Sequence, residues 1–439
     1  MADLNYVKIG EVCTIEKGST GLAKALPGKY PLVTTGAECK TSWDYQFDAE
    51  AVCIPLVSST GHGKKTLNYV HYQEGKFALG SILAALIPKD ENTLNARYLH
   101  TYLQKNKDRV LVPLMKGAAN VSLSVKAISN IEIPLLSIQK QEEILKKIDS
   151  ISNEQRDLLS ESDTQINLFT QLRQAVLQEA IEGKLTAEWR KQNLHLISGE
   201  NHASKLLKRI QTEKDHLIKE GKIRKDKPLP SITEDEKPFA LPDGWAWCRL
   251  GECGTVNPRN HIDDDLEVSF SPMKLISGEY GINPRFESRK WHQVKAGFTH
   301  FAENDVAIAK ITPCFENSKA CVFQGLINGY GAGTTELHVL RPIVMHPFFI
   351  YIFVKTTAFL RNGEAQMTGA CGQKRVPVEC FSQAPFPCPP LKEQIAIVER
   401  VNVLMKDIDE LKQQVSERKE QSELLMQLVL REVFEHSHA

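Results

Sequence analysis

The chain has 439 residues, 42% of them hydrophobic, and its 54 lysines and arginines equal its 54 aspartates and glutamates in number. This length exceeds one ordinary hydrophobic core, so we expect several domains, and a net charge of zero excludes DNA binding by bulk charge alone. The sequence has no run of 18 apolar residues, no signal-like N-terminus and no C-x-x-C pair among its ten cysteines, which predicts a cytoplasmic protein with reduced thiols, no membrane span and no structural zinc.

Residues 1–132 are expected to fold as a globular module, and residues 133–185 as a long helix. Pro134 suits a helix start, because proline is tolerated in the first turn. Apolar residues then recur in alternating steps of three and four: Ile138, Leu145, Ile148, Leu159, Ile166, Phe169 and Val176. Such a narrow stripe is typical of a coiled-coil seam. A helix of about 45 residues is roughly 65 Å long and needs a partner to bury this seam.

Residues 186–242 connect this helix to the next module. The stretch 203–230 carries 9 basic and 4 acidic residues and shows helical spacing up to Lys219. Two interpretations stay open: a solvated helix followed by a flexible linker, or a surface that contacts phosphates. The stretch 227–245 is rich in proline and charge, which is typical of a tether.

Residues 243–385 form a second expected module, and residues 386–439 a second long helix. The seam of this helix consists of Leu391, Val398, Val401, Met405, Ile408 and Val415. The two helices are related by an offset of 253 residues. Residues 133–182 align without a gap with residues 386–435 and share ten identities in fifty positions, where composition alone gives roughly three.

The repeat extends upstream of the helices. "YVKIGEV" at 6–12 resembles "WCRLGEC" at 247–253, and residues 115–134 resemble residues 367–387 with one residue inserted. We therefore predict an α+β fold with an internal pseudo-twofold repeat. Two mixed α/β domains are joined by two long helices that form an antiparallel coiled coil. The modules differ widely between these markers, so we expect one scaffold used for two versions of one task.

Several stretches together resemble a known family. They are "IPLLSIQKQEEI" and "FPCPPLKEQIAI" at the helix starts, "LPDGWAWCRLGEC" at the start of the second module, and "AIAKITPCFENSKACVF" and "GYGAGTTELHVLRP" within it. In this order and duplication they resemble the specificity subunit of type I restriction–modification systems. The resemblance implies two target-recognition domains, each reading one half of a split double-stranded DNA sequence, and helices that act as a spacer.

The resemblance also implies the partners and cofactors. Two methylation subunits would dock on the helices, and motor–nuclease subunits would join through them. The chain itself would perform no chemistry and bind no cofactor, and S-adenosylmethionine, ATP and Mg²⁺ would bind to the partner subunits. No methylation motif of the N-P-P-Y type and no Walker A loop occurs in the sequence, which agrees with this division of labour.

Sequence readout requires side chains that contact base edges, and phosphate contacts that position them. In the first module, the loop "SSTGHGKKT" and the segment "MKGAAN" supply the candidates Ser59, Thr60, His62, Lys64, Lys65, Lys116 and Asn120. In the second, "KITPCFENSK", "NGYGAGTTE" and "GQKRVP" supply Lys310, Asn317, Lys319, Tyr330, Thr334, Thr335, Lys374 and Arg375. For each of these residues, an ordinary surface or loop role remains the alternative.

The helices carry the candidate partner contacts. Gln141 and Gln394 occupy matching places just inside each helix, where either a capped helix start or a partner contact is expected; Gln174 and Gln427 match in the same way near the helix ends. The apolar faces of "QLRQAVLQEAI" and "LLMQLVLREVF" are wider than a two-helix seam requires. This excess indicates a third helix from a partner subunit.

Three alternatives remain open on sequence grounds. The first is a specificity subunit for a fused restriction–methylation polypeptide. The second is a self-sufficient DNA methyltransferase or nuclease, and the third is a coiled-coil scaffold that does not bind DNA. The first differs only in its partner. Methyl transfer to DNA by the purified chain alone would identify the second alternative. Selection of a DNA sequence in the presence of the partner would exclude the third.

Overall fold

The computed structural model describes residues 5–22, 25–60, 63–118, 120–225, 227–370 and 372–435. The chain forms two compact units. Unit 1 consists of Met1–Asp163 and Val415–Ala439, and unit 2 of Thr164–Gln414. Helices α4 (Ile138–Ile181) and α11 (Leu391–Glu435) each contribute to both units. The units therefore divide the chain inside the long helices, whereas the sequence pattern placed the boundaries at the helix starts.

The described part of unit 1 contains two four-stranded sheets, with strand orders β2-β9-β6-β7 and β4-β3-β8-β5, and an antiparallel pair of β1 and β10. The strands are β1 (Asn5–Lys8), β2 (Cys13–Lys17), β3 (Tyr30–Val33), β4 (Lys40–Ser42), β5 (Phe47–Asp48), β6 (Ala51–Pro55), β7 (His71–Gln73), β8 (Lys76–Leu79), β9 (Leu83–Pro88) and β10 (Glu132–Leu135). The helices are α1 (Ile9–Val12), α2 (Ala96–Val110), η1 (Val112–Leu114) and α3 (Val125–Ser129). Strand β6, with the sequence AVCIP, is buried along its whole length, which explains its continuous apolar run.

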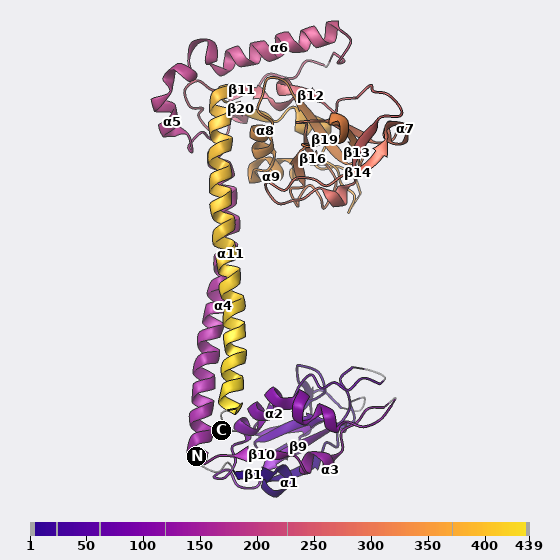
Figure 1. The fold of residues 1–439 in the computed structure, drawn as a ribbon, viewed down its shortest axis with the longest axis vertical. Coiled ribbons are helices and arrows are strands. Elements are labelled where there is room, and N and C mark those ends of the chain that lie inside the picture. Colours follow the sequence, from indigo (N-terminus) through magenta and orange to yellow (C-terminus); the bar gives the residue numbers. More distant parts are fainter. Residues whose placement is uncertain are drawn as a thin grey trace. The chain divides into compact units, whose positions relative to one another are not determined.

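Helix α2 covers the first sheet of unit 1 (Figure 1). The main core joins sheet residues such as Ile54 and Leu86 to Leu99 of α2, and it continues onto the long helices at Leu145 and Met426. The start of α2 is capped by Asn95, whose side-chain oxygen accepts from the backbone N–H groups of residues 97 and 98. One apolar cluster thus fixes the module to the beginning of α4 and to the end of α11.

The described part of unit 2 has strand orders β12-β19-β16-β17 and β14-β13-β18-β15, and an antiparallel pair of β11 and β20. The strands are β11 (Ala246–Arg249), β12 (Gly254–Val256), β13 (Glu267–Ser271), β14 (Glu287–Lys290), β15 (Thr299–Ala302), β16 (Val306–Ala309), β17 (Ala320–Val322), β18 (Tyr330–Gly333), β19 (Leu337–Pro342) and β20 (Pro385–Cys388). The helices include η5 (Leu250–Cys253), η6 (Met273–Leu275), α7 (Trp291–Val294), η7 (Ile327–Gly329), α8 (Pro347–Val354), α9 (Thr357–Ala365) and α10 (Val378–Ser382).

The two units have the same topology, strand by strand. The strand orders become identical when ten is added to each strand number of unit 1. The pair β3 and β8 is parallel, as is the pair β13 and β18, while the other paired strands of both units are antiparallel. The predicted α+β fold with an internal repeat is confirmed at this level, although the two modules share little sequence.

The long helices pair in antiparallel fashion within each unit. Lys419 of α11 forms an ion pair with Asp163 of α4 at 3.0 Å in unit 1, and Arg173 pairs with Asp409 in unit 2. The second pair lies ten residues later than the first on α4 and ten residues earlier on α11, as antiparallel helices require. The predicted seam is largely buried, most completely at Leu145, Val176, Val398, Val401, Met405 and Ile408, whereas Ile138, Leu159, Ile166, Phe169 and Leu391 are only partly buried.

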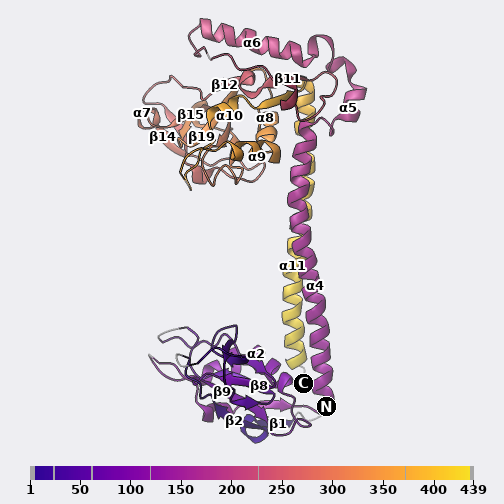
Figure 2. The same ribbon diagram turned by 180° about the vertical axis from the view of Figure 1, so that it is seen from behind.

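The connecting segment after α4 is folded onto unit 2, which corrects the expectation of a solvated helix and a flexible tether. It contains α5 (Ala187–Gln192), η2 (Leu194–Leu196), η3 (Gly199–Asn201), α6 (Ala203–Lys219) and η4 (Glu234–Glu236). Helix α6 runs across the end of the unit that carries β11 and η5 (Figures 1 and 2). Its residues Leu206 and Ile210 belong to the core, and Lys214 donates to the Gly251 carbonyl oxygen at 2.8 Å.

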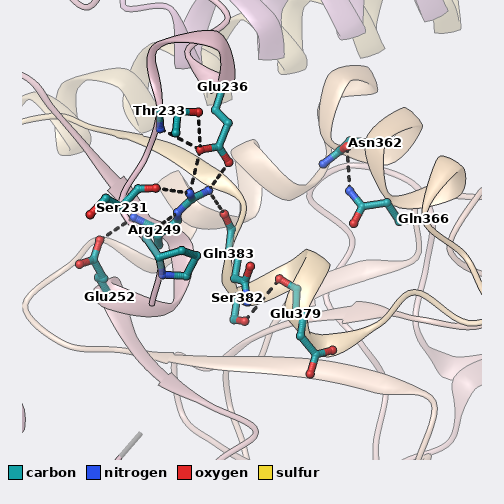
Figure 3. A network of polar contacts seen from close by, with 11 residues as sticks. Ser231, Thr233, Glu236, Arg249, Glu252, Asn362, Gln366, Glu379, Ser382 and Gln383 are labelled. Carbon is teal, nitrogen blue, oxygen red and sulfur yellow. Dashed lines mark hydrogen bonds and ion pairs between the residues drawn. The ribbon is translucent and has the colours of Figure 1, made fainter. Parts of the chain in front are cut away.

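Arg249 fastens the end of this segment to the module (Figure 3). Its guanidinium donates to both carboxylate oxygens of Glu236, at 2.7 and 2.8 Å, and to backbone carbonyls of Pro230, Ser231 and Gln383. These contacts use all of its donor capacity, so the buried charge is compensated. The proline-rich stretch is therefore a strap on unit 2 and not a free tether.

Candidate nucleic-acid interface

In each unit the central strand of the first sheet extends beyond the sheet and pairs with a glycine turn; we call this region the strand–turn edge. In unit 1, strand β6 continues through Leu56 and Ser58. The N–H of Ser58 donates to the Val121 carbonyl at 3.1 Å, and the N–H of Leu123 donates to the Leu56 carbonyl at 2.9 Å. The turn itself is closed by two backbone hydrogen bonds between Lys116 and Ser122, each 2.8 Å long.

The same edge is present in unit 2, where β16 continues through Lys310 and Thr312. The N–H of Thr312 donates to the Lys374 carbonyl at 3.0 Å, and the N–H of Val376 donates to the Lys310 carbonyl at 2.8 Å. Thr368 and Arg375 close the turn with hydrogen bonds of 3.0 and 2.8 Å. The turn of unit 2 is one residue longer than that of unit 1, as the single-residue insertion in the sequence alignment requires.

Both turns depend on a glycine in the left-handed region. Gly117 has a φ of +120° and Gly369 a φ of +121°. A Cβ atom at Gly117 would lie 2.2 Å from the Asn120 carbonyl oxygen, and one at Gly369 would lie 3.0 Å from the Gln373 carbonyl oxygen. Other residues are strained in this conformation, so both turns have the same backbone requirement.

The loop that follows the edge in unit 1 is held by its hydroxyl groups. Ser59 Oγ accepts from the Asn68 N–H at 3.0 Å, and the hydroxyls of Thr60 and Thr66 are 2.6 Å apart. These predicted contact residues therefore serve the loop itself. The remaining predicted residues of the edge, Lys64, Lys65, Lys116 and Asn120, are exposed, and His62 lies outside the described residues.

The loop and the turn of unit 1 are neighbours. A Cβ atom on Gly63 would lie 3.2 Å from the Ala118 carbonyl oxygen, so Gly63, beside the two lysines, touches the turn that carries Lys116. The sequence separates these segments by about fifty residues, and the fold brings them to one surface. This surface offers three lysines and an amide, a set suited to phosphates and base edges.

The predicted residues of unit 2 separate into two groups. Lys310, Thr334, Thr335, Lys374 and Arg375 lie at or next to the strand–turn edge, where the Lys310 N–H donates to the Glu336 carbonyl at 3.0 Å. The others lie elsewhere. Lys319 donates from Nζ to the Met273 carbonyl at 3.1 Å, Tyr330 packs against the cluster of Trp291, and Asn317 is exposed in the loop after Pro313.

Glu336 was not predicted, yet it organises the edge of unit 2. Its two carboxylate oxygens accept from Nε and Nη2 of Arg375 at 2.9 and 2.8 Å. The hydrogen bonds from Arg375 hold the pKa of the Glu336 carboxyl below its ordinary value. These two residues are 39 positions apart in the sequence, so no local pattern could have joined them. An acidic residue is also an unexpected neighbour on a surface predicted to contact DNA.

Gln141 and Gln394 are buried and have no side-chain surface for a partner, which corrects one of the two interpretations. Gln141 is 0% exposed; its amide oxygen accepts from the Asn95 N–H at 2.9 Å, and its nitrogen donates to the carbonyls of Thr93 and Leu136 at 3.0 and 2.8 Å. Gln394 is also 0% exposed, accepting from the His346 N–H and donating to the Pro389 carbonyl, each at 2.9 Å. Each glutamine fastens the first turn of a long helix to the start of a module helix, α2 or α8.

The other predicted partner contacts are more accessible. Gln174 is partly buried and accepts from the hydroxyl of Thr357 at 2.8 Å, and Gln427 is exposed. Leucines on the outer faces of the helix ends are also exposed: Leu168 and Leu172 on α4 in unit 2, and Leu424, Leu425 and Leu428 on α11 in unit 1, with exposed fractions of 45–61%. On α11 this agrees with the apolar excess noted in the sequence. In the matching stretch of α4, Val176, Leu177 and Ile181 belong to the core of unit 2, so most of that apolar face is covered within the chain.

One hollow of unit 2 lies beside the Arg249 network. It has a volume of about 440 Å³, and Phe239, Trp247 and Phe359 are among its lining residues. The described residues contain no group of three histidine, cysteine or acidic side chains that could hold a metal ion. No described helix is long and apolar enough to cross a membrane.

Comparison with known proteins identifies a family. The family model described as "Type I restriction modification DNA specificity domain" matches residues 1–168 and 242–420, which is more than half of the chain. The two matched ranges correspond to the two modules with the parts of the long helices that follow them.

Several type I restriction enzyme specificity subunits are similar to the chain in sequence. Over 258 residues, the chain is 49% identical to the Escherichia coli type I restriction enzyme EcoAI specificity subunit and 47% identical to the EcoEI specificity subunit. Each match covers 58% of this chain but only 42% of the relative, so the alignment spans less than half of these relatives. A third match, 23% identical to the EcoDI specificity subunit, covers 98% of this chain and 88% of the relative.

Two solved structures share the fold. A chain from a study of complex assembly and conformational transition in the type I R-M system superposes with a TM-score of 0.60 at 14% identity, covering 99% of this chain and 98% of that one. The HsdS subunit of Thermoanaerobacter tengcongensis superposes with a TM-score of 0.56 at 14% identity, covering 99% and 97%.

Proposed function

Because the chain belongs to the type I restriction modification DNA specificity family, we propose that it is the non-catalytic subunit that chooses the DNA sequence for a type I restriction–modification complex. Each unit contacts one half of a bipartite target in double-stranded DNA through its strand–turn edge. The helices connect the two halves and bind two methylation subunits, through which the motor–nuclease subunits join.

One observation carries this proposal: the two units have one scaffold but different side chains at the edge. Positions that share the same backbone hydrogen bonds are Leu56 and Lys310, and likewise Ser122 and Arg375. The shared backbone hydrogen-bond pattern would present each edge to DNA in the same way, while the different side chains would contact different base edges. A duplicated scaffold with altered readout is what an asymmetric split target requires.

The partner proposal rests on the exposed leucines of the helix ends. Leu424, Leu425 and Leu428 gather on one end of α11 in unit 1, and Leu168 and Leu172 lie on the end of α4 in unit 2. Contiguous exposed apolar surface is typical of a protein interaction site. Because the two ends are related by the internal repeat, each supplies one docking site for a methylation subunit.

The chemistry belongs to those partners. S-adenosylmethionine would bind to the methylation subunits, and ATP and Mg²⁺ would bind to the motor–nuclease subunits, so that this chain contributes recognition alone. The complex would work in the cytoplasm, since the cysteines of the described residues are all free thiols, as in reducing compartments.

The test of DNA selection uses the full chain co-expressed with the methylation subunits of its system and a pool of duplexes with a randomised segment. Captured duplexes should share two fixed blocks separated by a gap of constant length. A pool that stays random after repeated selection, or one uninterrupted block, contradicts the proposal.

The docking surface is tested separately. Replacing Leu424, Leu425 and Leu428 with glutamine should weaken co-purification of a methylation subunit. Leu26 is 71% exposed and belongs to no helix, so Leu26→Gln serves as the matched control and should leave co-purification unchanged. Equal retention of the partner by both variants contradicts docking at this helix end.

A further inference from the structure

The strand–turn edge of unit 2 carries a bidentate ion pair that has no counterpart among the described residues of unit 1. Glu336 corresponds to Ile82, because the N–H of Lys310 donates to the Glu336 carbonyl as the N–H of Leu56 donates to the Ile82 carbonyl. Arg375 likewise corresponds to Ser122. The pair is therefore an addition to the shared scaffold and not a part of it.

The ion pair between Arg375 and Glu336 contributes little to the stability of the fold. The Arg375 side chain is 44% exposed and that of Glu336 is 22% exposed, and ion pairs at such exposure contribute little to folding. The backbone hydrogen bonds of the edge are made in both units, with and without the pair. What the pair does achieve is a fixed guanidinium on a protein surface.

The backbone beneath Arg375 is held on two sides. It exchanges hydrogen bonds with Thr368 across the turn, and it lies opposite Ile311 on the extended strand. The guanidinium is fixed in turn by both oxygens of Glu336, which itself is held by the hydrogen bond from its N–H to Thr334 Oγ1 at 3.2 Å. A side chain supported in this way loses little conformational freedom when it binds a ligand.

Donors remain on this guanidinium. Arginine has five N–H groups. In the described structure, two point to Glu336 and one Nη1 group donates to the Gln373 carbonyl at 3.1 Å. One N–H on each of Nη1 and Nη2 is left for a ligand. Two donors on one plane match the paired acceptors O6 and N7 of guanine in the major groove, which is the commonest specific contact of arginine with DNA.

The geometry points to Arg375 as a residue that reads a guanine in the half-site of unit 2, with Glu336 as the residue that positions it. This inference rests on the proposed function and deepens it, because it names one base and the group that reads it. Lys374, the exposed neighbour on the same turn, has no such support and would contact phosphate. At the matching edge of unit 1, Ile82 and Ser122 cannot form this contact, so the half-site of unit 1 is read by other groups.

The experiment compares variants in the DNA selection described above. Wild type, Arg375→Ala, Arg375→Lys, Glu336→Gln and the control Lys374→Ala are each selected against the same randomised pool, with the full chain and its methylation subunits. Binding to the wild-type target, and to targets changed at one base pair, is then measured at several salt concentrations.

The assignment is supported if the wild type selects a target with a guanine in one half. Arg375→Ala and Arg375→Lys should then lose discrimination at that base pair alone. Discrimination at that pair should fall roughly 5- to 150-fold. Glu336→Gln should relax the same base pair in part without changing the salt dependence, whereas Lys374→Ala should weaken binding to all sequences and reduce the salt slope by about one.

Other outcomes overturn it. If Arg375→Ala weakens binding evenly for all sequences, Arg375 contacts phosphate and not a base. If Glu336→Gln changes only the melting temperature and not the selected sequence, Glu336 has a structural role alone. A wild-type chain that selects no sequence refutes the proposed function as well, which distinguishes that failure from failure of the arginine assignment.

Discussion

The two buried glutamines make the junction of each long helix with its module sensitive to a single substitution. Leucine in place of Gln141 fills a similar volume but leaves the Asn95 N–H and the carbonyls of Thr93 and Leu136 without the partners they have now. At about 1 kcal/mol for each partly buried group, the loss is ~3 kcal/mol. For a unit of this size, 1 kcal/mol shifts the melting temperature by about 2–4 °C, so Gln141→Leu should lower it by roughly 6–12 °C.

Differential scanning calorimetry of the full chain measures this shift. Gln394→Leu should act in the same direction but somewhat less, at ~2 kcal/mol, because its third contact is a weak one to the sulfur of Met345 at 3.4 Å. Gln427→Leu is the matched control: Gln427 is exposed on α11, and surface changes are usually within about 0.5 kcal/mol. A Gln141→Leu protein that melts with the control would refute the role given to the buried amide.

Two further predictions concern charge. Lys64 and Lys65 are exposed on the loop of unit 1, so Lys64→Ala with Lys65→Ala should weaken DNA binding and lower the slope of log K against log salt by about two in a salt titration; an unchanged slope would place both lysines away from the phosphates. His338 is 4% exposed, and burial lowers its pKa to about 4. Its folded pKa lies below its unfolded value, so the folded state loses stability as the pH falls from about 6.5 to 4, by up to ~3 kcal/mol. Urea unfolding at several pH values should show this loss in wild type and less of it in His338→Gln, which keeps a donor for the Val376 carbonyl; equal losses would assign the acid sensitivity to other groups.

The repeat and the helices could be predicted because their signals lie in continuous stretches of the sequence. The seam positions recur with helical spacing, and the offset of 253 residues pairs one helix with the other. The sheets could not be derived in this way. Their strands are two to six residues long, and the pairing of β6 with β9 or of β16 with β19 joins segments that no periodicity connects.

The sequence patterns did not predict which charged and polar residues the fold buries. Lys214 was part of a stretch that looked solvated, yet it donates to the Gly251 carbonyl oxygen in unit 2. Glu393 is 0% exposed and accepts from Arg190 and Trp245, at 2.8 Å in each case. A sequence shows the charge of such residues but not their hydrogen-bond partners, because those partners come from other segments of the chain.

The candidate interface was predicted in part for the same reason. Lys64, Lys65 and Lys116 were proposed because loops rich in glycine and lysine are recognisable. The fold places these loops side by side, and contact of the three lysines with DNA stays a prediction. Lys319 was proposed as a DNA contact, and in the structure its Nζ donates to the Met273 carbonyl. Glu336 was overlooked, since its role depends on Arg375, 39 residues away.

The most direct test of the account exchanges one module and maps the methylated DNA. Residues 1–132 are replaced by the corresponding module of a family member with a different target, and modified adenines are located by sequencing genomic DNA from cells that carry the complex. One half of the bipartite site should change, while the other half and the gap stay as they were. A change in both halves, or a modified site without a gap, would contradict separate recognition by the two units.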